Sequence, residues 1–350
     1  MDDDTVFPAL LESLLRTPAP SGREGPVADL VAKSMPAGVE ISHDALGSLL
    51  LRAPGRLGAR PRLAILGHMD EVGLMVMGID DEGMLAIGPV GHVVPETFVA
   101  QRIRILTAAG EVLGVIGREP GWFPGTDYEP ALASFPSMRI DIGARDRHEA
   151  AELVQIGDAA VVDVEPIRLA NGHVASRSFD DRFGVYVAAE VVRRLVDAGG
   201  PPTDVVGIGT VQEETALAGA HTAPYAAEPD LAIAVDVDYA APAPREHGWP
   251  ADGLGAGVVV MRGTVVDDHL AGRLIRTAAA ERIPHLIRAY PGESQTDADG
   301  AALTRSGVPT AVVSIPLRNM HTPVEVAQLA DIEACVRLLV AFAGSIDPDG

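Results

Sequence analysis

The sequence is poor in cysteine, aromatic residues and lysine, and it lacks any long apolar run. Its one cysteine, Cys335, cannot form an internal disulfide and lies in an apolar pattern, so we expect it in the core. Aromatic residues make up only 4% of the 350 residues, so the core must be built mostly from Val, Leu, Ile and Ala. No run of 18 uncharged apolar residues is present, and the N-terminus is acidic where a signal peptide is basic. We therefore expect a cytoplasmic protein that does not enter a membrane.

The charge balance is strongly acidic. Lys33 is the only lysine among 27 basic residues, and the formal net charge at pH 7 is −22. Nucleic acids and anionic membranes bind basic surfaces, so we expect neither as a partner. Most of the carboxylates must be solvated surface groups, and only a handful are candidates for a binding site.

Two kinds of pattern divide the chain. From about residue 71 to residue 167, short Val- and Ile-rich runs are punctuated by Gly and Pro, which is typical of a small closed or sandwich-like β domain. On either side, strand patterns alternate with amphipathic helix patterns, which is typical of a mostly parallel sheet flanked by helices. We predict an α/β fold in which residues 1–70 and 168–350 form one domain and residues 71–167 form an inserted β-barrel or sandwich domain.

Polar residues mark two predicted helix starts. Asp180 and Asp181 precede the apolar-periodic segment 185–196, which predicts a buried helix. Acidic residues in a first helical turn complement the helix dipole, so capping would be the better explanation of an isolated Asp-Asp pair. Ser21, with Glu24 three residues later, has the form of a capping box and predicts a second helix start.

Four further groups of His, Asp and Glu fall at predicted strand ends or in loops. They are His68 with Asp70, Glu213 with Glu214, Asp236, and His321. Taken singly, a surface turn, a solvated acidic loop or a satisfied loop histidine would explain most of them. Asp236, however, interrupts an otherwise buried strand, where an unpaired carboxylate would cost on the order of several kcal/mol. Parallel sheets bind ligands at the carboxyl ends of their strands, so we expect these groups to converge.

The chemistry of this set is that of a metal site. Two histidines and three carboxylates are the ligands expected for a pair of divalent ions such as Zn²⁺, Co²⁺ or Mn²⁺. One carboxylate would bridge two ions about 3.5–4 Å apart. Of Glu213 and Glu214, one would bind metal and the other would stay free as a base for an activated water. Asp70 could orient the His68 imidazole.

Five stretches of the chain, spread over nearly its whole length, resemble the motifs of the tetrahedral aminopeptidase family. The family is also called glutamyl aminopeptidase and, in older usage, cellulase-M or endoglucanase. The stretches are Gly67-His68-Met69-Asp70-Glu71-Val72-Gly73, Phe179-Asp180-Asp181-Arg182, Val211-Gln212-Glu213-Glu214, Ala234-Val235-Asp236-Val237 and residues 316–325 around Asn319-Met320-His321-Thr322. Asn319 departs from the aromatic residue expected before Met320, and Thr322 from a serine, but the metal-binding residues match.

The resemblance implies a role for each site residue. His68 and Asp236 would hold one metal ion, Glu214 and His321 the other, and Asp180 would bridge them. Glu213 would be the general base, and Asp70 would support His68. The resemblance also implies short peptides as substrates, a bend or cis peptide bond at Asp180-Asp181, and an inserted domain that helps dimers assemble into a tetrahedral dodecamer.

Three functions fit these observations. The first is a metal-dependent aminopeptidase that removes N-terminal residues from peptides. The second is a deacylase or amidase on the same scaffold, acting on an N-acyl amino acid or sugar with the same metal ligands. The third is a non-catalytic assembly protein with structural metals, although such a protein would not need Glu213 as a free base. We predict the first.

Overall fold

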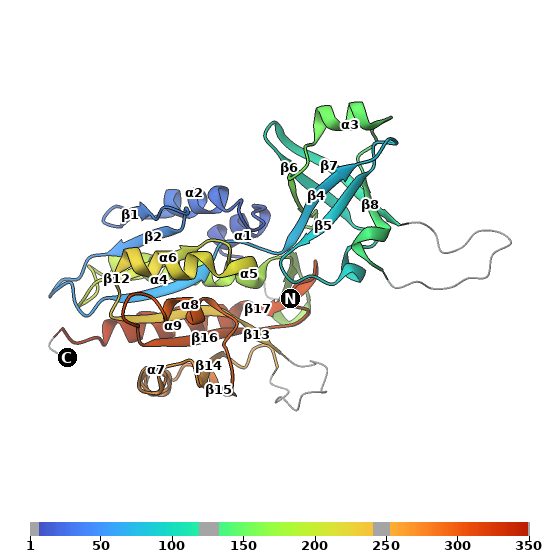
Figure 1. Ribbon diagram of the computed structural model, residues 1–350. Coiled ribbons are helices and arrows are strands. Elements are labelled where there is room, and N and C mark those ends of the chain that lie inside the picture. The colour runs from blue at the N-terminus through green and yellow to red at the C-terminus, as the bar shows by residue number, and fades with distance from the viewer. Residues whose placement is uncertain (1–6, 119–132, 241–252, 349–350) are drawn as a thin grey trace.

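The computed structural model describes residues 7–118, 133–240 and 253–348 (Figure 1). Its main element is an eight-stranded sheet with the strand order β1-β2-β12-β3-β13-β16-β14-β15. The bounds are β1 Glu40–His43, β2 Leu49–Ala53, β12 Val205–Thr210, β3 Leu63–His68, β13 Leu231–Tyr239, β16 Thr310–Leu317, β14 Val258–Gly263 and β15 His285–Tyr290. The central strands β12, β3, β13 and β16 are parallel, whereas β2 and β14 pair antiparallel with β12 and β16. The predicted parallel sheet is thus confirmed at its centre, and antiparallel pairs complete it on both sides.

Helices cover both faces of the sheet. One face carries α1 Ala9–Arg16, α2 Gly25–Ser34, α4 Phe179–Asp197, α7 Asp268–Ala280 and α9 Leu329–Gly344, and the other carries α6 Ala218–Ala227 and α8 Asp297–Ala301. The short helix α5 Glu213–Ala216 contacts α6. Because side chains alternate along a strand, Leu63 and Ile65 of β3 join the larger core, whereas Ala64 and Leu66 join the smaller core beside α6. In the part of the chain that the structure describes, no helix combines the length and apolarity that a membrane crossing requires.

Helix α4 lies directly against strand β3 because two glycines meet there. A Cβ atom on Gly67 would overlap the main chain of Gly184, and one on Gly184 would overlap the Asp181 carboxylate. Neither position therefore admits a side chain. Since His68 follows Gly67 and Asp180 lies in the first turn of α4, this contact between main chains brings the first candidate metal ligands together.

Between β3 and α4 the chain forms a closed six-stranded barrel in the order β4-β5-β8-β7-β6-β9, which stands at one end of the main sheet (Figure 1). The strands are β4 Gly73–Ile79, β5 Leu85–Val90, β6 Arg102–Thr107, β7 Gly110–Arg118, β8 Met138–Asp141 and β9 Ala159–Val162, accompanied by α3 Arg147–Leu153 and the 3₁₀ turns η1 Pro95–Phe98 and η2 Phe135–Ser137. Its interior is a separate cluster of Leu, Ile, Val, Phe and Met side chains. The predicted small β fold is therefore a barrel with its own core.

A small second sheet, which the sequence did not predict, pairs the segment before α4 with the segment before α9. It consists of β10 Ile167–Arg168, β11 His173–Ser176 and β17 Glu325–Gln328, and the turn η3 Ala170–Gly172 separates the first two strands. Strand β17 pairs with β11, which leads into α4. This pairing places the segment after His321 beside the start of α4.

The predicted capping box at Ser21 is wrong. Helix α2 begins at Gly25 with Glu24 as its N-cap, and the Ser21 hydroxyl donates instead to Asp70 Oδ2 at 2.5 Å. The Glu24 carboxylate accepts from the main-chain N–H groups of Gly22 at 2.7 Å and Gln212 at 3.0 Å. Both side chains thus form hydrogen bonds with groups around the candidate site and not with each other's main chain. A local helix pattern does not reveal such long-range partners.

Candidate metal centre

The predicted site residues converge at the carboxyl edge of the parallel strands. His68 ends β3, Glu213 and Glu214 follow β12, Asp236 lies in β13, and His321 follows β16. Together with Asp180 they line one cavity of about 710 Å³. Asp70 does not line the cavity and is fully buried. The structure therefore brings together every residue that the sequence proposed for the site.

Asp180 lies between the two histidines. Its Oδ1 is 3.1 Å from His68 Nε2, and its Oδ2 is 3.1 Å from His321 Nε2. Burial alone would raise the pKa of Asp180, but hydrogen bonds and charge interactions with both imidazoles hold it below its ordinary value. One carboxylate that faces two imidazoles, one oxygen to each, has the arrangement of a bridging ligand.

Main-chain carbonyls orient both imidazole rings. His68 Nδ1 lies 3.2 Å from the Asp70 main-chain oxygen and 3.5 Å from Asp70 Oδ1, and His321 Nδ1 lies 2.7 Å from the main-chain oxygen of His92. A carbonyl oxygen can only accept a hydrogen bond, so each Nδ1 carries the proton. Attraction to the surrounding carboxylates outweighs burial and raises the pKa of both imidazoles, so without a cation Nε2 is protonated as well and donates to Asp180. A bound cation would take the place of that Nε2 proton, while Nδ1 keeps its own.

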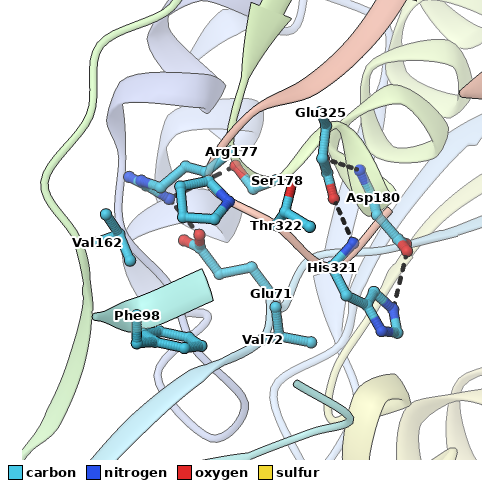
Figure 2. Close-up of a pocket in the computed structure, with 11 residues that line it drawn as sticks. Glu71, Val72, Phe98, Val162, Arg177, Ser178, Asp180, His321, Thr322 and Glu325 are labelled. Atoms are coloured by element: carbon cyan, nitrogen blue, oxygen red, sulfur yellow. Dashed lines mark hydrogen bonds and ion pairs between the residues drawn. The ribbon is translucent and has the colours of Figure 1, made fainter. Parts of the chain in front are cut away.

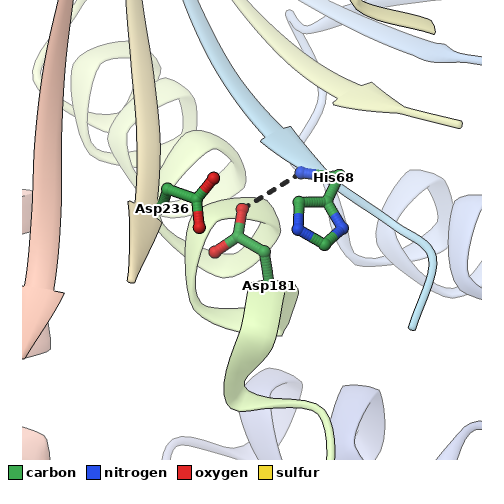
Figure 3. A group of neighbouring side chains, drawn as sticks. All are labelled: His68, Asp181 and Asp236. Atoms are coloured by element: carbon green, nitrogen blue, oxygen red, sulfur yellow. Dashed lines mark hydrogen bonds between the residues drawn. The ribbon is translucent and has the colours of Figure 1, made fainter. Parts of the chain in front are cut away.

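A second group of possible ligands consists of His68, Asp181 and Asp236, whose ligand atoms lie within 4.8 Å of one another (Figure 3). Asp181 Oδ2 accepts from the main-chain N–H of His68 at 3.1 Å, and Oδ1 accepts from that of Gly184 at 2.8 Å. The Asp180-Asp181 peptide bond is cis, as the resemblance led us to expect. Sequence reasoning gave Asp181 no ligand role, although its place beside Asp180 was a signal for one.

The carboxylates around these histidines are too crowded to be stable as unpaired anions. Burial raises the pKa of Glu213 to about 9 and that of Asp236 to about 8, and repulsion from neighbouring carboxylates adds to both shifts. The same causes raise the pKa of Glu214, whose buried Oε1 has no hydrogen-bond partner among the described residues and lies 3.5 Å from His321 Nε2. These buried oxygens lack enough positive charge around them. Together with the imidazole nitrogens they form a set of ligands suited to divalent cations.

The Asp70 carboxylate has a wider role than the sequence suggested. Besides the contact with His68, it accepts hydrogen bonds from the main-chain N–H groups of Glu213 at 3.0 Å and Glu214 at 3.2 Å. Burial opposes its ionisation, but bonds from His68, Ser21 and Glu213 hold the pKa of Asp70 below its ordinary value. Asp70 thus ties the end of β3 to the start of α5.

Glu325 also ties two segments of the site together through hydrogen bonds to main-chain N–H groups (Figure 2). Its buried carboxylate accepts from the main-chain N–H of His321 at 2.9 Å and from that of Asp180 at 3.3 Å. Glu71 forms buried ion pairs with Arg177 and Arg182 beside it. Sequence reasoning gave Glu325 no role of its own, although it lies in one of the five motifs. No local pattern shows that its carboxylate joins two distant segments.

Known proteins resemble this chain in both sequence and fold. The model of the M42 glutamyl aminopeptidase family matches residues 47–338. The lysyl aminopeptidase of Pyrococcus furiosus is 33% identical over 343 residues, with 97% of each chain covered. The TET aminopeptidase from the marine sediment archaeon Thaumarchaeota archaeon SCGC AB-539-E09 has 32% identity, a TM-score of 0.91 and 97% coverage of both chains.

A further similar structure is the TET1 peptidase of Pyrococcus horikoshii, described as able to assemble into a tetrahedron or a large octahedral shell. It has 29% identity and a TM-score of 0.85, and the match covers 96% of this chain and 99% of that one. These likenesses extend over the sheet, the barrel and the candidate metal centre together. The chain belongs to the M42 glutamyl aminopeptidase family and is a peptide-bond hydrolase.

Proposed function

We propose that the chain is an aminopeptidase that uses two divalent ions to remove N-terminal residues from short peptides. The observation that carries the proposal is the position of Asp180, with one carboxylate oxygen facing each histidine. In this assignment His68 and Asp236 would hold one ion, Glu214 and His321 would hold the other, and Asp180 would contribute to both. Zn²⁺, Co²⁺ and Mn²⁺ all suit this mixture of nitrogen and oxygen ligands.

Glu213 is the proposed general base. The bound ions would supply an acidified water and polarise the scissile carbonyl. Glu213 lines the cavity with its Oε2 at 3.8 Å from His68 Nε2, close to the ligands but outside the assigned set. Its carboxylate takes a proton from the water and returns it to the nitrogen of the departing amine. Asp70 holds the Glu213 main chain during this exchange.

The first test is a peptide series with free N-termini, assayed beside the same peptides carrying an N-acetyl group. Protein stripped with a chelator is compared with protein reloaded with Zn²⁺, Co²⁺ or Mn²⁺. We expect metal-dependent release of the first residue from the free peptides only. Removal of the acetyl group instead would establish the deacylase. Two bound ions per chain with no hydrolysis of either series would favour a structural role.

The same series tests which N-terminal residue is preferred. Among the described residues that line the cavity there is no lysine or arginine, while Glu293 and Asp299 add carboxylates beyond the proposed metal ligands. Asp238, a third, is neutralised by an ion pair with Arg288 at 2.7 Å. These carboxylates should repel an acidic side chain of the substrate and attract a basic one. We therefore expect kcat/KM to be at least about 10-fold higher for peptides that begin with Lys or Arg than for peptides that begin with Glu or Asp. The name of the Pyrococcus furiosus relative agrees with this preference.

A matched variant locates the source of that preference. Glu293→Gln keeps the side-chain size but removes one exposed carboxylate, and it should narrow the ratio between basic and acidic N-termini. Glu281→Gln, an exposed exchange outside the cavity, is the control. An unchanged ratio in Glu293→Gln, or a preference for Glu in the parent protein, would contradict this assignment.

We also propose that the chain forms a homo-oligomer, with dimers assembling into a tetrahedral dodecamer and residues 71–167 as the assembly domain. The support is the tetrahedral assembly described for the Pyrococcus horikoshii peptidase. Light scattering coupled to gel filtration should give about twelve times the chain mass of 36.5 kDa. Stable monomers at micromolar concentration would refute the proposal.

A further inference from the structure

We propose that the inserted barrel completes the metal centre, because its residue His92 positions His321 through a main-chain carbonyl. The inference rests on the proposed function, since it concerns how one of the proposed ligands is held. It gives the barrel a task inside each chain, separate from any task in assembly. His92 is here a positioning residue, and its carbonyl oxygen is the group that acts.

The contact joins two parts of the fold that are far apart in the sequence. His92 lies in the connection between β5 and η1 of the barrel, two residues after β5 ends at Val90. Its carbonyl oxygen is 2.7 Å from His321 Nδ1, the shortest hydrogen bond that either candidate imidazole makes. Because this bond requires the proton on Nδ1, it leaves Nε2 facing Asp180 and Glu214.

His321 needs such support more than His68 does. The His68 side chain is 2% exposed and enclosed by the sheet, whereas that of His321 is 27% exposed and lies on a loop. Glu325 holds only the His321 main-chain N–H, and this bond does not determine how the ring turns. Without the His92 carbonyl, the ring could rotate or place its proton on Nε2, and either change would remove the lone pair from the site.

The barrel connection fits closely against a second proposed ligand. Gly91 has φ +77°, and a Cβ atom there would lie 2.9 Å from Val72 Cγ1 and 3.4 Å from both Cβ and Oε2 of Glu214, which are ordinary contacts. A side chain at this position would therefore strike Val72, and we expect the connection to shift away from the site. The carbonyl of His92, the next residue, would move with it.

A pair of glycine variants separates this effect from backbone strain. Gly143 lies in another barrel connection with φ +78°, and a Cβ atom there would meet nothing within 4 Å. Gly91→Ala and Gly143→Ala thus impose the same unfavourable backbone conformation, but only Gly91→Ala should displace the His92 carbonyl. Val72→Ala removes the atom that an alanine at position 91 would strike, so the double variant Gly91→Ala/Val72→Ala should let the connection return.

The measurement is a calorimetric titration of each metal-free protein with Zn²⁺, accompanied by the visible absorption of Co²⁺-loaded protein. In Gly91→Ala we expect one of the two ions to bind about 10- to 100-fold more weakly, the usual effect of losing a group that orients a ligand. Gly143→Ala should bind both ions as the parent does, and the double variant should regain at least part of the lost affinity. The Co²⁺ spectrum should change in Gly91→Ala alone.

Equal affinities in Gly91→Ala and Gly143→Ala, or a double variant as weak as Gly91→Ala, would overturn the inference about the barrel. If both ions still bind to the parent and it cleaves peptides, the proposed function survives that result. A parent protein that binds no pair of ions would overturn both proposals together. If Gly91→Ala does not fold, the nitrogen chemical shifts of the metal-loaded parent protein, labelled with ¹⁵N-histidine, decide: a His321 proton on Nδ1 would support the inference, and a proton on Nε2 would overturn it.

Discussion

Replacing Glu213 with Gln should lower kcat by about 10²- to 10⁴-fold while the protein still folds and binds metal. Glutamine keeps the size of the side chain but cannot take a proton from water. The main-chain N–H of residue 213, which donates to Asp70, is unaffected by the exchange. In the proposed assignment Glu213 is not a metal ligand, so the stoichiometry of bound ions should stay at two per chain. Steady-state kinetics and metal analysis of the same preparation measure both quantities.

Two comparison variants make the Glu213 result specific. Glu82→Gln, an exposed exchange in the barrel, should leave kcat unchanged. Glu214→Gln should lower the metal content as well as the activity, because Glu214 is a proposed ligand. The role of Glu213 as base would be refuted if Glu213→Gln kept more than a tenth of the parent kcat, and its exclusion from the ligand set would be refuted if the variant lost an ion.

Removing the metal ions should abolish turnover and make the stability of the protein fall as the pH rises. In the absence of cations, burial raises the pKa of Glu213 to about 9 and that of Asp236 to about 8. Between the ordinary carboxyl pKa near 4 and these values, the folded state binds more protons than the unfolded state. The free energy of unfolding therefore decreases with pH across this window, and the contribution of these groups is fully present only below it.

Bound cations should remove this dependence, because they favour the ionised carboxylates in the folded state. The measurement is the Tm of stripped and reloaded protein between pH 5 and pH 9. We expect the stripped protein to lose at least about 2 kcal/mol over this range, which corresponds to a fall of several degrees, and the reloaded protein to change much less. Asp236→Asn, which cannot ionise, should flatten the stripped curve. Parallel curves for the two forms would show that these carboxylates do not control stability.

The sequence predicted those features that depend on periodic patterns. Alternating strands and helices indicated the central parallel sheet, and the ends of its strands located His68, Glu213 and Asp236 at one edge. The change of pattern near residue 71 indicated the barrel. Such signals are readable because each one is local, and the convergence of parallel strands then brings distant residues together.

Long-range hydrogen bonds left no such signal. Ser21 had the sequence context of a helix cap, yet its hydroxyl binds Asp70, and Glu325 joins two segments that are separated by more than a hundred residues. The His92 contact was beyond sequence reasoning altogether, because the acting group is a main-chain carbonyl that every residue type carries. Arg288, which neutralises Asp238, likewise comes from a different strand.

The contact of β3 with α4 at Gly67 and Gly184 limits how this enzyme can be redesigned. Where side chains separate two elements, a larger or smaller residue can adjust their spacing, but here main-chain atoms already touch. No side chain separates β3 from α4 at this point. Neither selection nor engineering can therefore adjust the distance between the His68 and Asp180 main chains by changing the size of a side chain. Attempts to change the preferred metal would have to exchange the ligating groups themselves, because the framework that holds them cannot be loosened in small steps.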